Sequence, residues 1–433
     1  MRIVTTVLSY ALFALAVPFL LGRAKLRRGF KERLGLHPRG WPGLPPDAPR
    51  VIFHGASAGD ILALLPTVKA LRQLRPEARL IATTITNSGH AIIQKHADAF
   101  DAATYLPYDL PVAVRRCLGA IKPDLLVLEY TELWPNLIHC AKTQGVSIVL
   151  HNGRLNGARL RRYRWLFRLA GNLLNAMSLL LMRDEGEADR ALALGADAAR
   201  VCVAGNTKFD RLGQPPSAES IATLRAISGY TMGTLVWVAG STHEGEEELL
   251  LETFAQLRRD FPTLKLILAP RYTERSDRLL SMAVKRGFSA RLRSKSGPSP
   301  EVLVLDTIGE LTTCYAIATL VFVGGSFIKR GGQNILEPAA CGKPVLFGPN
   351  MHNFTDAVQV LLGRGGIQVA SSQQLERVIR DLLSRPDHLR ELGAMARAQL
   401  GANRGAALRN AKSIAALLPR GKPGPGSHGK PTR

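Results

Sequence analysis

Residues 321–349 constrain the fold of this chain more than any other segment, because two apolar runs there flank a loop with four glycines. We expect a buried strand, the glycine-rich loop, a short helix and a second buried strand, which together form a βαβ unit of a parallel sheet. Glycine lets the backbone adopt positive φ and approach a ligand closely, and glycines stand at positions 324, 325, 331 and 332. The segment therefore predicts a ligand-binding turn at one end of a parallel sheet.

Two polar residues at the start of the short helix extend this prediction to a nucleotide sugar. Asn334 and Glu337 stand where the N-terminal amides of the helix favour a phosphate. The Glu337 carboxylate can accept hydrogen bonds from the vicinal hydroxyls of a sugar, and ligands of α/β sheets bind at the carboxyl ends of the strands. An ordinary βαβ turn with glycines for packing is the alternative, because short glycine patterns are weak signals.

Strand-like apolar runs alternate with helical segments along most of the chain, which indicates βαβ units and parallel sheets. In the first half we expect strands at residues 51–55, 79–85, 124–128, 146–151 and 178–182. The regularity breaks over residues 206–232 and then restarts, with strands expected at 234–240, 264–270, 302–305 and 320–323. The predicted fold class is α/β, with two doubly wound, Rossmann-like domains facing a cleft, the arrangement called GT-B.

The N-terminus carries an uncharged segment, residues 3–22, which is long enough to cross a bilayer as one helix. A signal peptide is the competing interpretation, but its apolar region would be shorter and would precede a cleavage site, whereas a basic run follows here. That run predicts a body in the cytoplasm by the positive-inside rule. We expect an uncleaved membrane anchor, with a helix lying flat in the membrane interface as a variant because Pro18 weakens the span.

The chain is strongly basic, with 57 Lys and Arg against 34 Asp and Glu, a net charge of +23. This balance suits an anionic partner: nucleic acid, an anionic membrane surface or a phosphorylated substrate. Basic residues cluster within residues 23–33 and 154–168, and no nucleic-acid-binding signature accompanies them, so we expect no nucleic acid partner. A solvated basic face remains open for the second cluster.

Several classes of site are not indicated. The five cysteines are scattered and form no CxxC pair, so they predict neither disulfides nor zinc, and we expect no metal and no cofactor. The chain contains no GxSxG, P-loop or HExxH motif, and Gly324-Gly325-Ser326 differs from the GxGxxG of dinucleotide folds. These absences weaken hydrolase, ATPase and dehydrogenase interpretations.

Candidate catalytic residues follow two predicted strands of the first half. Asp60 falls in the first turn of a helix after residues 51–55, where a carboxylate is favoured by the helix dipole and can act as general base on an incoming hydroxyl. Glu129 and Glu132 follow the strand expected over 124–128 and lie beside Trp134, which fits sugar binding. The alternatives are that Asp60 only caps its helix and that Glu132 is a structural anchor.

Candidate ligand-binding turns follow the strands of the second half. Ser241 and Thr242 offer hydroxyls and amides to a phosphate, and His243 adds a cation or donor. Arg271 ends the next strand and can pair with a phosphate or a base carbonyl. Residues 306–311 form a further strand-to-helix turn. The convergence of these turns predicts a ligand site more strongly than any one of them.

Together these motifs resemble the 3-deoxy-D-manno-octulosonic acid (Kdo) transferases of Gram-negative lipopolysaccharide assembly. The similarity runs from the N-terminal segment to about residue 415. The matching motifs lie at residues 32–35, 54–60, 83–89, 105–109, 131–138, 152–156, 205–210, 241–247, 269–271, 306–311 and 324–349.

The resemblance implies a membrane-bound, metal-independent, inverting glycosyltransferase with CMP-Kdo as donor and the lipid A precursor as acceptor. It would lie at the inner (cytoplasmic) membrane with a single N-terminal anchor. By this resemblance we expect the following organisation: a membrane anchor over 1–22, a basic linker over 23–50, an acceptor-binding domain over 51–210, a connection over 211–231, a CMP-sugar-binding domain over 232–418 and a disordered tail over 419–433.

The resemblance also assigns roles to individual residues. Asp60 takes the position of the catalytic base, while Glu132 and Arg154 fall on the acceptor side. The residues implied for the donor are Ser241, Thr242, Arg271, Thr307, Gly309, Glu310, Asn334 and Glu337.

The chain departs from the family pattern at three positions: Glu is usual where Asp60 stands, and His is usual where Gln333 and Tyr272 stand. A paralogue that uses another CMP-ulosonic acid or acceptor, and a non-catalytic binding protein on the same scaffold, are therefore the alternative hypotheses.

Overall fold

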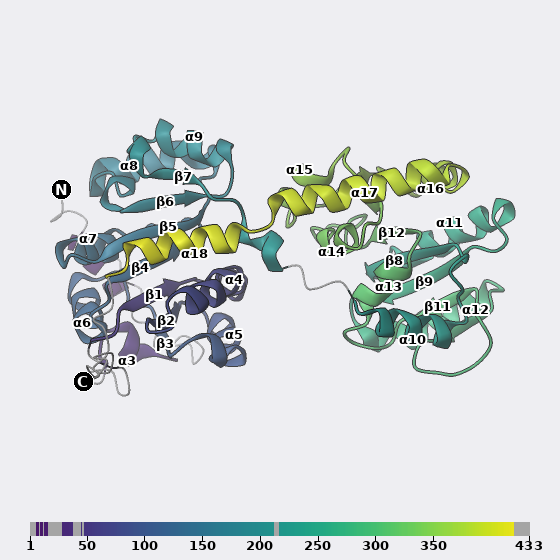
Figure 1. The fold of residues 1–433 in the computed structure, drawn as a ribbon, viewed down its shortest axis with the longest axis horizontal. Helices are drawn as coiled ribbons and strands as arrows, with labels where there is room; N and C mark the ends of the chain where they lie inside the picture. The colour runs from purple at the N-terminus through teal and green to yellow at the C-terminus, as the bar shows by residue number, and fades with distance from the viewer. Residues whose placement is uncertain are drawn as a thin grey trace, which may run out of the picture. The chain divides into compact units, whose positions relative to one another are not determined.

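The computed structural model describes residues 6–7, 9–11, 13–15, 28–37, 45, 47–211 and 216–419. The chain divides into two compact units: unit 1, which comprises Met1–Arg211 and Arg404–Arg433, and unit 2, which comprises Leu212–Asn403. Each unit contains a parallel seven-stranded sheet with helices packed on it (Figure 1). The prediction of two parallel α/β domains is confirmed.

The sheet of unit 1 has the strand order β3-β2-β1-β4-β5-β6-β7. The strands are β1 (Arg50–His54), β2 (Arg79–Thr84), β3 (Ala102–Tyr105), β4 (Leu125–Glu129), β5 (Ser147–Gly153), β6 (Leu179–Met182) and β7 (Val201–Val203). The helices are α3 (Phe30–Arg33), α4 (Ala58–Leu74), α5 (Asn87–Lys95), α6 (Pro111–Ile121), α7 (Pro135–Thr143), α8 (Leu160–Ala170), α9 (Glu185–Ala193) and α18 (Ala406–Leu417).

Alternate residues of the central strands enter two separate cores, one on each face of this sheet. Ile52 of β1 and Leu126 of β4 belong to the core that α6 and α7 cover. Val51 and Phe53 of β1 belong to the core that α4 and α18 cover. Because both faces are buried, these strands read as continuous apolar runs, which is why the sequence reveals them.

The sheet of unit 2 has the strand order β10-β11-β9-β8-β12-β13-β14. The strands are β8 (Val236–Thr242), β9 (Lys265–Pro270), β10 (Ala290–Leu292), β11 (Val302–Val304), β12 (Leu320–Val323), β13 (Val345–Phe347) and β14 (Gly366–Gln368). The helices are α10 (Ala218–Ser228), α11 (Glu247–Asp260), α12 (Ser276–Lys285), α13 (Leu311–Ile317), α14 (Leu336–Ala340), α15 (Thr355–Leu361), α16 (Ser372–Ser384) and α17 (Pro386–Asn403).

The last helix of the described chain belongs to a different unit from the one expected. The sequence assigns residues up to 418 to the second domain, but α18 packs against α4 in unit 1 (Figure 1). Ala411 and Ile414 of α18 are fully buried there, and the Asp210 carboxylate accepts hydrogen bonds from the backbone N–H groups of Gly405 and Ala407. An amphipathic pattern identifies a helix but not the surface that it covers, so the sequence leaves this partner undetermined.

Some of the expected segments fall on undescribed parts of the chain. The anchor predicted over 1–22 lies largely outside the described residues, and so does the tail predicted over 419–433. Among the helices that are described, none has both the length and the apolar character needed to span a membrane. Part of the predicted linker is ordered on unit 1, because Glu32 of α3 accepts hydrogen bonds from the Thr104 hydroxyl and the Tyr105 N–H, both 3.0 Å long.

Candidate active site

Each sheet has a point where the strand order reverses, and ligands of open α/β sheets bind at the carboxyl ends of the strands that meet there. In unit 1 the reversal lies between β1 and β4, and in unit 2 it lies between β8 and β12. Asp60 follows β1, and Glu132 follows β4. His243 and the glycine-rich loop follow β8 and β12, respectively. Asp60, Glu132, His243 and the glycine-rich loop thus lie at these two points, each within its own unit. Arg271 and the turn at residues 306–311 follow the adjacent strands β9 and β11.

Asp60 is half-buried in the first turn of α4 and takes part in a capping box with Ser57. One carboxylate oxygen, Oδ2, accepts hydrogen bonds from the Ser57 N–H at 2.8 Å and from the Ser57 hydroxyl at 2.9 Å. The capping role considered as an alternative is therefore present. It involves one oxygen of the carboxylate, so capping and base catalysis are compatible at this residue.

A fully buried polar network lies at the ends of β4 and β5. Glu129 accepts a hydrogen bond from Asn152 Nδ2 at 2.8 Å and pairs with His151 Nδ1. The other ring nitrogen of this histidine, Nε2, lies 2.8 Å from the Thr67 hydroxyl of α4. Burial raises the pKa of the Glu129 carboxyl, the pairing with His151 opposes this rise, and the charge of Asp60 adds to it. The network therefore lies close enough to Asp60 to interact with it electrostatically.

The sequence revealed Glu129 but not its partners. His151 ends an apolar run that was expected to be a plain buried strand. Asn152 also donates to the Thr207 hydroxyl at 2.7 Å, a contact across 55 residues of chain. The detectable signal was the pair of polar residues at the end of a buried strand, because buried polar groups require partners.

Glu132 is held beside β1 rather than directed freely into solvent. The indole N–H of Trp134 donates to Glu132 Oε2 at 2.7 Å, and His54 Nε2 lies 3.4 Å from the same oxygen. His54 is buried, and its Nδ1 lies 3.0 Å from the Thr83 hydroxyl. These contacts favour the anchoring role that was the alternative for Glu132. Arg154 is exposed, and its backbone N–H donates to the Tyr130 carbonyl at 3.2 Å.

Backbone strain is concentrated at these strand ends. Four non-glycine residues of the described chain have positive φ, and three of them lie in the last residues of strands at the reversal points or beside them, or just after such a strand: Tyr130 at 53°, Asn152 at 50° and Ser241 at 55°. Such conformations cost about 1–3 kcal/mol each and cluster at functional sites. Their positions support the assignment of the site to these strand ends.

In unit 2 a glutamate occupies the amides of the glycine-rich loop. The Glu246 carboxylate is fully buried and accepts hydrogen bonds from the N–H groups of Gly325 at 2.7 Å, Ser326 at 3.0 Å and Phe327 at 2.9 Å. The His243 N–H donates to it at 3.1 Å. The sequence predicts that the amides of this loop bind a ligand, but in the structure these amides donate to the Glu246 side chain. The sequence gave no sign of this, because Glu246 stands among several glutamates of a charged turn.

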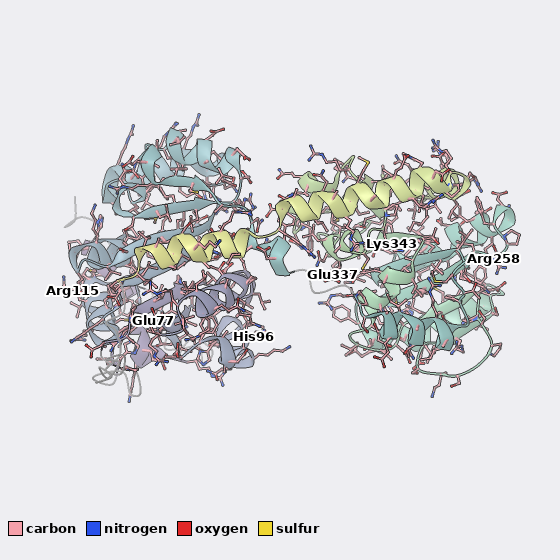
Figure 2. The ribbon with its side chains drawn as sticks, in the orientation of Figure 1. Glu77, His96, Arg115, Arg258, Glu337 and Lys343 are labelled. Carbon is pink, nitrogen blue, oxygen red and sulfur yellow. The ribbon has the colours of Figure 1, made fainter. Side chains whose placement is uncertain are left out.

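The residues at the start of α14 bind one another. Asn334 Nδ2 donates to Glu337 Oε1 at 2.9 Å, and the Leu336 N–H donates to Asn334 Oδ1 at 3.1 Å. Glu337 lies in the first turn of this five-residue helix (Figure 2). Asn334, which precedes the N-cap residue Ile335, therefore binds the first turn of the helix and orients the Glu337 carboxylate, which the sequence assigned to a sugar.

Thr242 is buried at the end of β8 and supports the neighbouring turn. Its hydroxyl donates to Glu247 Oε1 at 3.1 Å, and Arg275 binds both oxygens of Glu247 at 2.8 Å. Ser241, next to it, makes a side-chain hydrogen bond with the buried Tyr315, whose pKa burial raises well above its ordinary value. Arg275 was not among the predicted residues.

The turn after β11 is also closed by internal contacts. Glu310 accepts hydrogen bonds from the Thr307 hydroxyl and from Arg293, and Gly309 adopts a φ of 92° that favours glycine. Ile308, between them, is 89% exposed. Thr307, Gly309 and Glu310 thus form the predicted turn, with Arg293 as a partner that the sequence did not reveal.

His243 lies at the centre of a group of positive charges. Its side chain is buried, with 7% exposed, and its Nε2 lies 3.4 Å from Gln333 Nε2. Its ring contacts the Tyr272 ring edge to face, with 5.9 Å between the ring centroids. Burial lowers the pKa of His243, and the charges of Arg330, Arg271 and Arg275 lower it further. Gln333 and Tyr272, two of the departures noted in the sequence, therefore both contact this histidine.

Within the described residues, no group of three or more His, Cys, Asp or Glu side chains is placed to hold a metal ion. Burial raises the pKa of the Cys117 and Cys314 thiols to about 12. These two thiols therefore stay protonated and act as small core residues.

Comparison with known proteins relates this geometry to a family. A family profile described as 3-deoxy-D-manno-octulosonic-acid transferase (Kdo transferase) matches residues 28–211. The 3-deoxy-D-manno-octulosonic acid transferase of Haemophilus influenzae is 32% identical over 388 residues, which cover 88% of this chain and 90% of that protein. That of Chlamydophila psittaci is 33% identical over 368 residues, which cover 84% of this chain and 82% of that protein.

A solved structure is similar in fold over most of the chain. The UDP-GlcNAc 2-epimerase of Neisseria meningitidis has a TM-score of 0.54 and 12% identity, and it covers 85% of this chain and 99% of its own. At this identity the likeness concerns the fold alone. The resemblance seen in the sequence is confirmed by the two relatives, and the chain belongs to the 3-deoxy-D-manno-octulosonic acid transferase family.

Proposed function

We propose that this protein is an inverting glycosyltransferase that moves Kdo from CMP-Kdo to the lipid A precursor in lipopolysaccharide biosynthesis. The observation that carries the proposal is the identity of 32% with a Kdo transferase across 88% of the chain. The placement of Asp60 at the reversal point of the unit 1 sheet supports it. The alternatives of another acid donor or a non-catalytic binding protein gain no support from these findings.

In this proposal Asp60 removes the proton of the acceptor hydroxyl as that oxygen attacks the anomeric carbon of Kdo. The transition state resembles an oxocarbenium ion, so the protein must also stabilise the charge that develops on the departing CMP phosphate. Arg271 and Arg330 are exposed side chains near His243 that can supply this stabilisation in unit 2. The proposed reaction uses no metal and no cofactor.

We assign acceptor binding to unit 1 and donor binding to unit 2. The acceptor is a phosphorylated, acylated disaccharide in an anionic membrane, and Arg154 lies on the exposed side of the β5 end that precedes α8. Around α8 the second basic cluster surrounds Trp165, which is 61% exposed. A basic surface with an exposed indole suits the interface of an anionic membrane. With the proposed N-terminal anchor, this would keep the protein at the inner membrane and its body in the cytoplasm.

The test is a transfer assay with purified full-length protein, CMP-Kdo and lipid A precursor in detergent, with the products resolved by mass spectrometry. We expect a lipid product that carries one or more Kdo residues and the release of CMP. Folded protein that yields no product with this acceptor would contradict the proposal.

The assigned base is tested in the same assay with Asp60→Asn. We expect turnover to fall by about a thousandfold or more, since general base catalysis contributes 10²–10⁴-fold and the amide cannot accept the proton. Donor affinity, measured by calorimetry with CMP, should be unchanged because Asp60 lies in unit 1. Unimpaired turnover would remove Asp60 from this role.

A further inference from the structure

His243 differs from the other residues of the proposed donor site because it is a buried titratable group whose ring pairs with no carboxylate of the described chain. It belongs to the turn between β8 and α11, and only its backbone bonds to a carboxylate, that of Glu246. That carboxylate is itself held on the amides of the glycine-rich loop. The neighbouring Glu244 is bound to Arg278 at 2.6 Å. The other carboxylates in the first turn of α11, those of Glu247 and Glu248, act on Arg275 and are not among the charges that shift the pKa of His243.

The elements packed around His243 present mainly cations. From the turn after β9 come Arg271, Tyr272 and Arg275, and from the loop after β12 come Arg330 and Gln333. The charge of Arg275 is compensated by the two hydrogen bonds to Glu247. Arg271 and Arg330 are exposed, and neither forms an ion pair with a carboxylate of the described chain. The surroundings therefore carry uncompensated positive charge and suit an anion.

The contact with Gln333 suits either charge state of the imidazole. The amide nitrogen of Gln333 lies 3.4 Å from Nε2, an arrangement in which a neutral ring accepts a hydrogen bond. Rotation of the amide by half a turn would present its oxygen to a protonated Nε2, because the two ends of a Gln side chain are a donor and an acceptor. A cationic side chain at position 333 would oppose protonation, whereas glutamine does not.

We propose that His243 takes up a proton when the anionic groups of the donor bind beside Arg271 and Arg330, so that a cationic imidazole faces the departing phosphate. This rests on the proposed function for the identity of the donor. The donor brings a phosphodiester and a sugar carboxylate, two negative charges that would offset the arginines. Opposite charge favours the protonated imidazole, so binding draws in a proton.

The transfer step is balanced without a further reactant. The bond between the anomeric carbon and the phosphate oxygen breaks, and its electron pair stays on that oxygen. The acceptor oxygen forms the new bond, and its proton passes to Asp60. His243 keeps its proton through this step, donates a hydrogen bond to the phosphate as its charge grows, and releases the proton when CMP leaves.

The direction in which donor affinity changes with pH follows from the pKa of His243 in the ligand-free protein. Because burial and the arginines lower the pKa of His243, the empty site holds a neutral imidazole at neutral pH. In the donor-bound protein the pKa of His243 is higher than in the free protein. Donor affinity therefore rises as the pH falls from the bound-state pKa to the free-state pKa, and it levels off below the free-state pKa. A single linked proton gives a change of at most about tenfold per pH unit.

The test uses the methyl ester of CMP, because its phosphodiester does not titrate near neutral pH whereas a phosphate monoester has a pKa near 6. Calorimetry of the full-length protein in two buffers of equal pH and different ionisation enthalpy gives the number of protons taken up. We expect a fraction of a proton for the wild type between pH 6 and 7.5, none for His243→Gln, and wild-type uptake for the control His388→Gln. His388 is an exposed residue on α17 of the same unit.

Three results would overturn the inference: binding of the ester without proton uptake, uptake that persists in His243→Gln, or no binding of the ester by folded wild-type protein. Turnover adds a second measure, since loss of an electrostatic donor costs on the order of a hundredfold in kcat. The two proposals fail separately. Transfer of Kdo without linked protonation contradicts this inference alone, and linked protonation without transfer contradicts the proposed function alone.

Discussion

Asp60 is the residue at which a structural role and a chemical role coincide. Its carboxylate completes the capping box of α4 and is also the proposed base. Loss of activity in Asp60→Asn could therefore come from a weakened helix start rather than from the missing base. Ser57 provides the means to separate the two roles, since it is the other half of the same capping box and carries no carboxylate.

For Ser57→Ala we expect a loss of about 1 kcal/mol in the free energy of unfolding, because the side chain of the N-cap residue is removed. Turnover should stay within a few-fold of wild type if Asp60 acts as the base, since the carboxylate remains. Urea unfolding and the transfer assay on one preparation measure both quantities. If Ser57→Ala and Asp60→Asn lose turnover equally, Asp60 acts only as a cap.

Glu246 is a buried anion that holds the glycine-rich loop in place, and Glu246→Gln tests how much the loop depends on it. A glutamine can accept from some of the amides, but its own N–H groups would face the others. Hydrogen bonds to charged groups contribute about 1.5–3 kcal/mol each, so we expect the free energy of unfolding to fall by about 2–4 kcal/mol. Urea unfolding measures this, with the exposed Glu252→Gln on the same helix as the control. Equal stability of the two variants would show that the carboxylate is dispensable.

At the residue scale, the sequence points to candidate residues where a polar side chain closely follows an apolar run. His243 directly follows β8, and Asp60 lies in the first turn of the helix after β1, both of which are local features of the sequence. Glu246 and His151 could not be assigned in this way. Their roles come from contacts with residues 79 and 22 positions away in the chain, a separation that no local pattern reports.

At the element scale, the ten strands expected from apolar runs are all present, and the four that were missed are β3, β7, β10 and β14. These four are the edge strands of the two sheets. Each has only three or four residues, and β7 is largely exposed. Edge strands bury little surface and so carry a weak apolar signal, whereas central strands are buried on both faces.

The glycine-rich loop is the element whose sequence was most informative, and Gly324→Ala tests why glycine stands there. A Cβ at this position would lie 2.6 Å from the Ser241 carbonyl oxygen and 2.6 Å from the Thr242 Cα, both of them backbone atoms. We expect a loss of about 2–3 kcal/mol, because overpacking against backbone cannot be relieved by a side-chain rotation.

The matched control for Gly324→Ala is Gly363→Ala. Gly363 has a positive φ of 71°, unlike Gly324, and a Cβ there meets no atom within 4 Å, so the two positions separate backbone strain from steric overlap. Its cost should be limited to the strain of a left-handed alanine, about 1–2 kcal/mol. Thermal unfolding compares the two variants, and a larger loss for Gly363→Ala would contradict the steric explanation.

At the scale of the whole molecule, α18 makes unit 1 depend on the end of the chain. Ile414→Ala should therefore destabilise unit 1 although the residue is far in sequence from the rest of that unit. We expect a loss of about 3 kcal/mol, which lowers the melting temperature of a unit of this size by about 6–12 °C. The unfolding transition of unit 2 should not move.

Scanning calorimetry follows the two transitions in one experiment, with Leu408→Ala as the control because Leu408 lies on the same helix and is 45% exposed. A shift of both transitions by Ile414→Ala would mean that the units unfold together. A shift of neither would mean that α18 contributes little to unit 1.

The return of α18 to unit 1 also fixes the order in which the two units can be completed on the ribosome. Unit 2 is continuous, Leu212–Asn403, so all of its residues have been made before α18 is synthesised. Unit 1 begins first but must wait for its last helix, and until then the side of α4 that α18 covers stays uncovered on the nascent chain. The unit that begins the chain is therefore the last to be completed, after unit 2 has been synthesised in full.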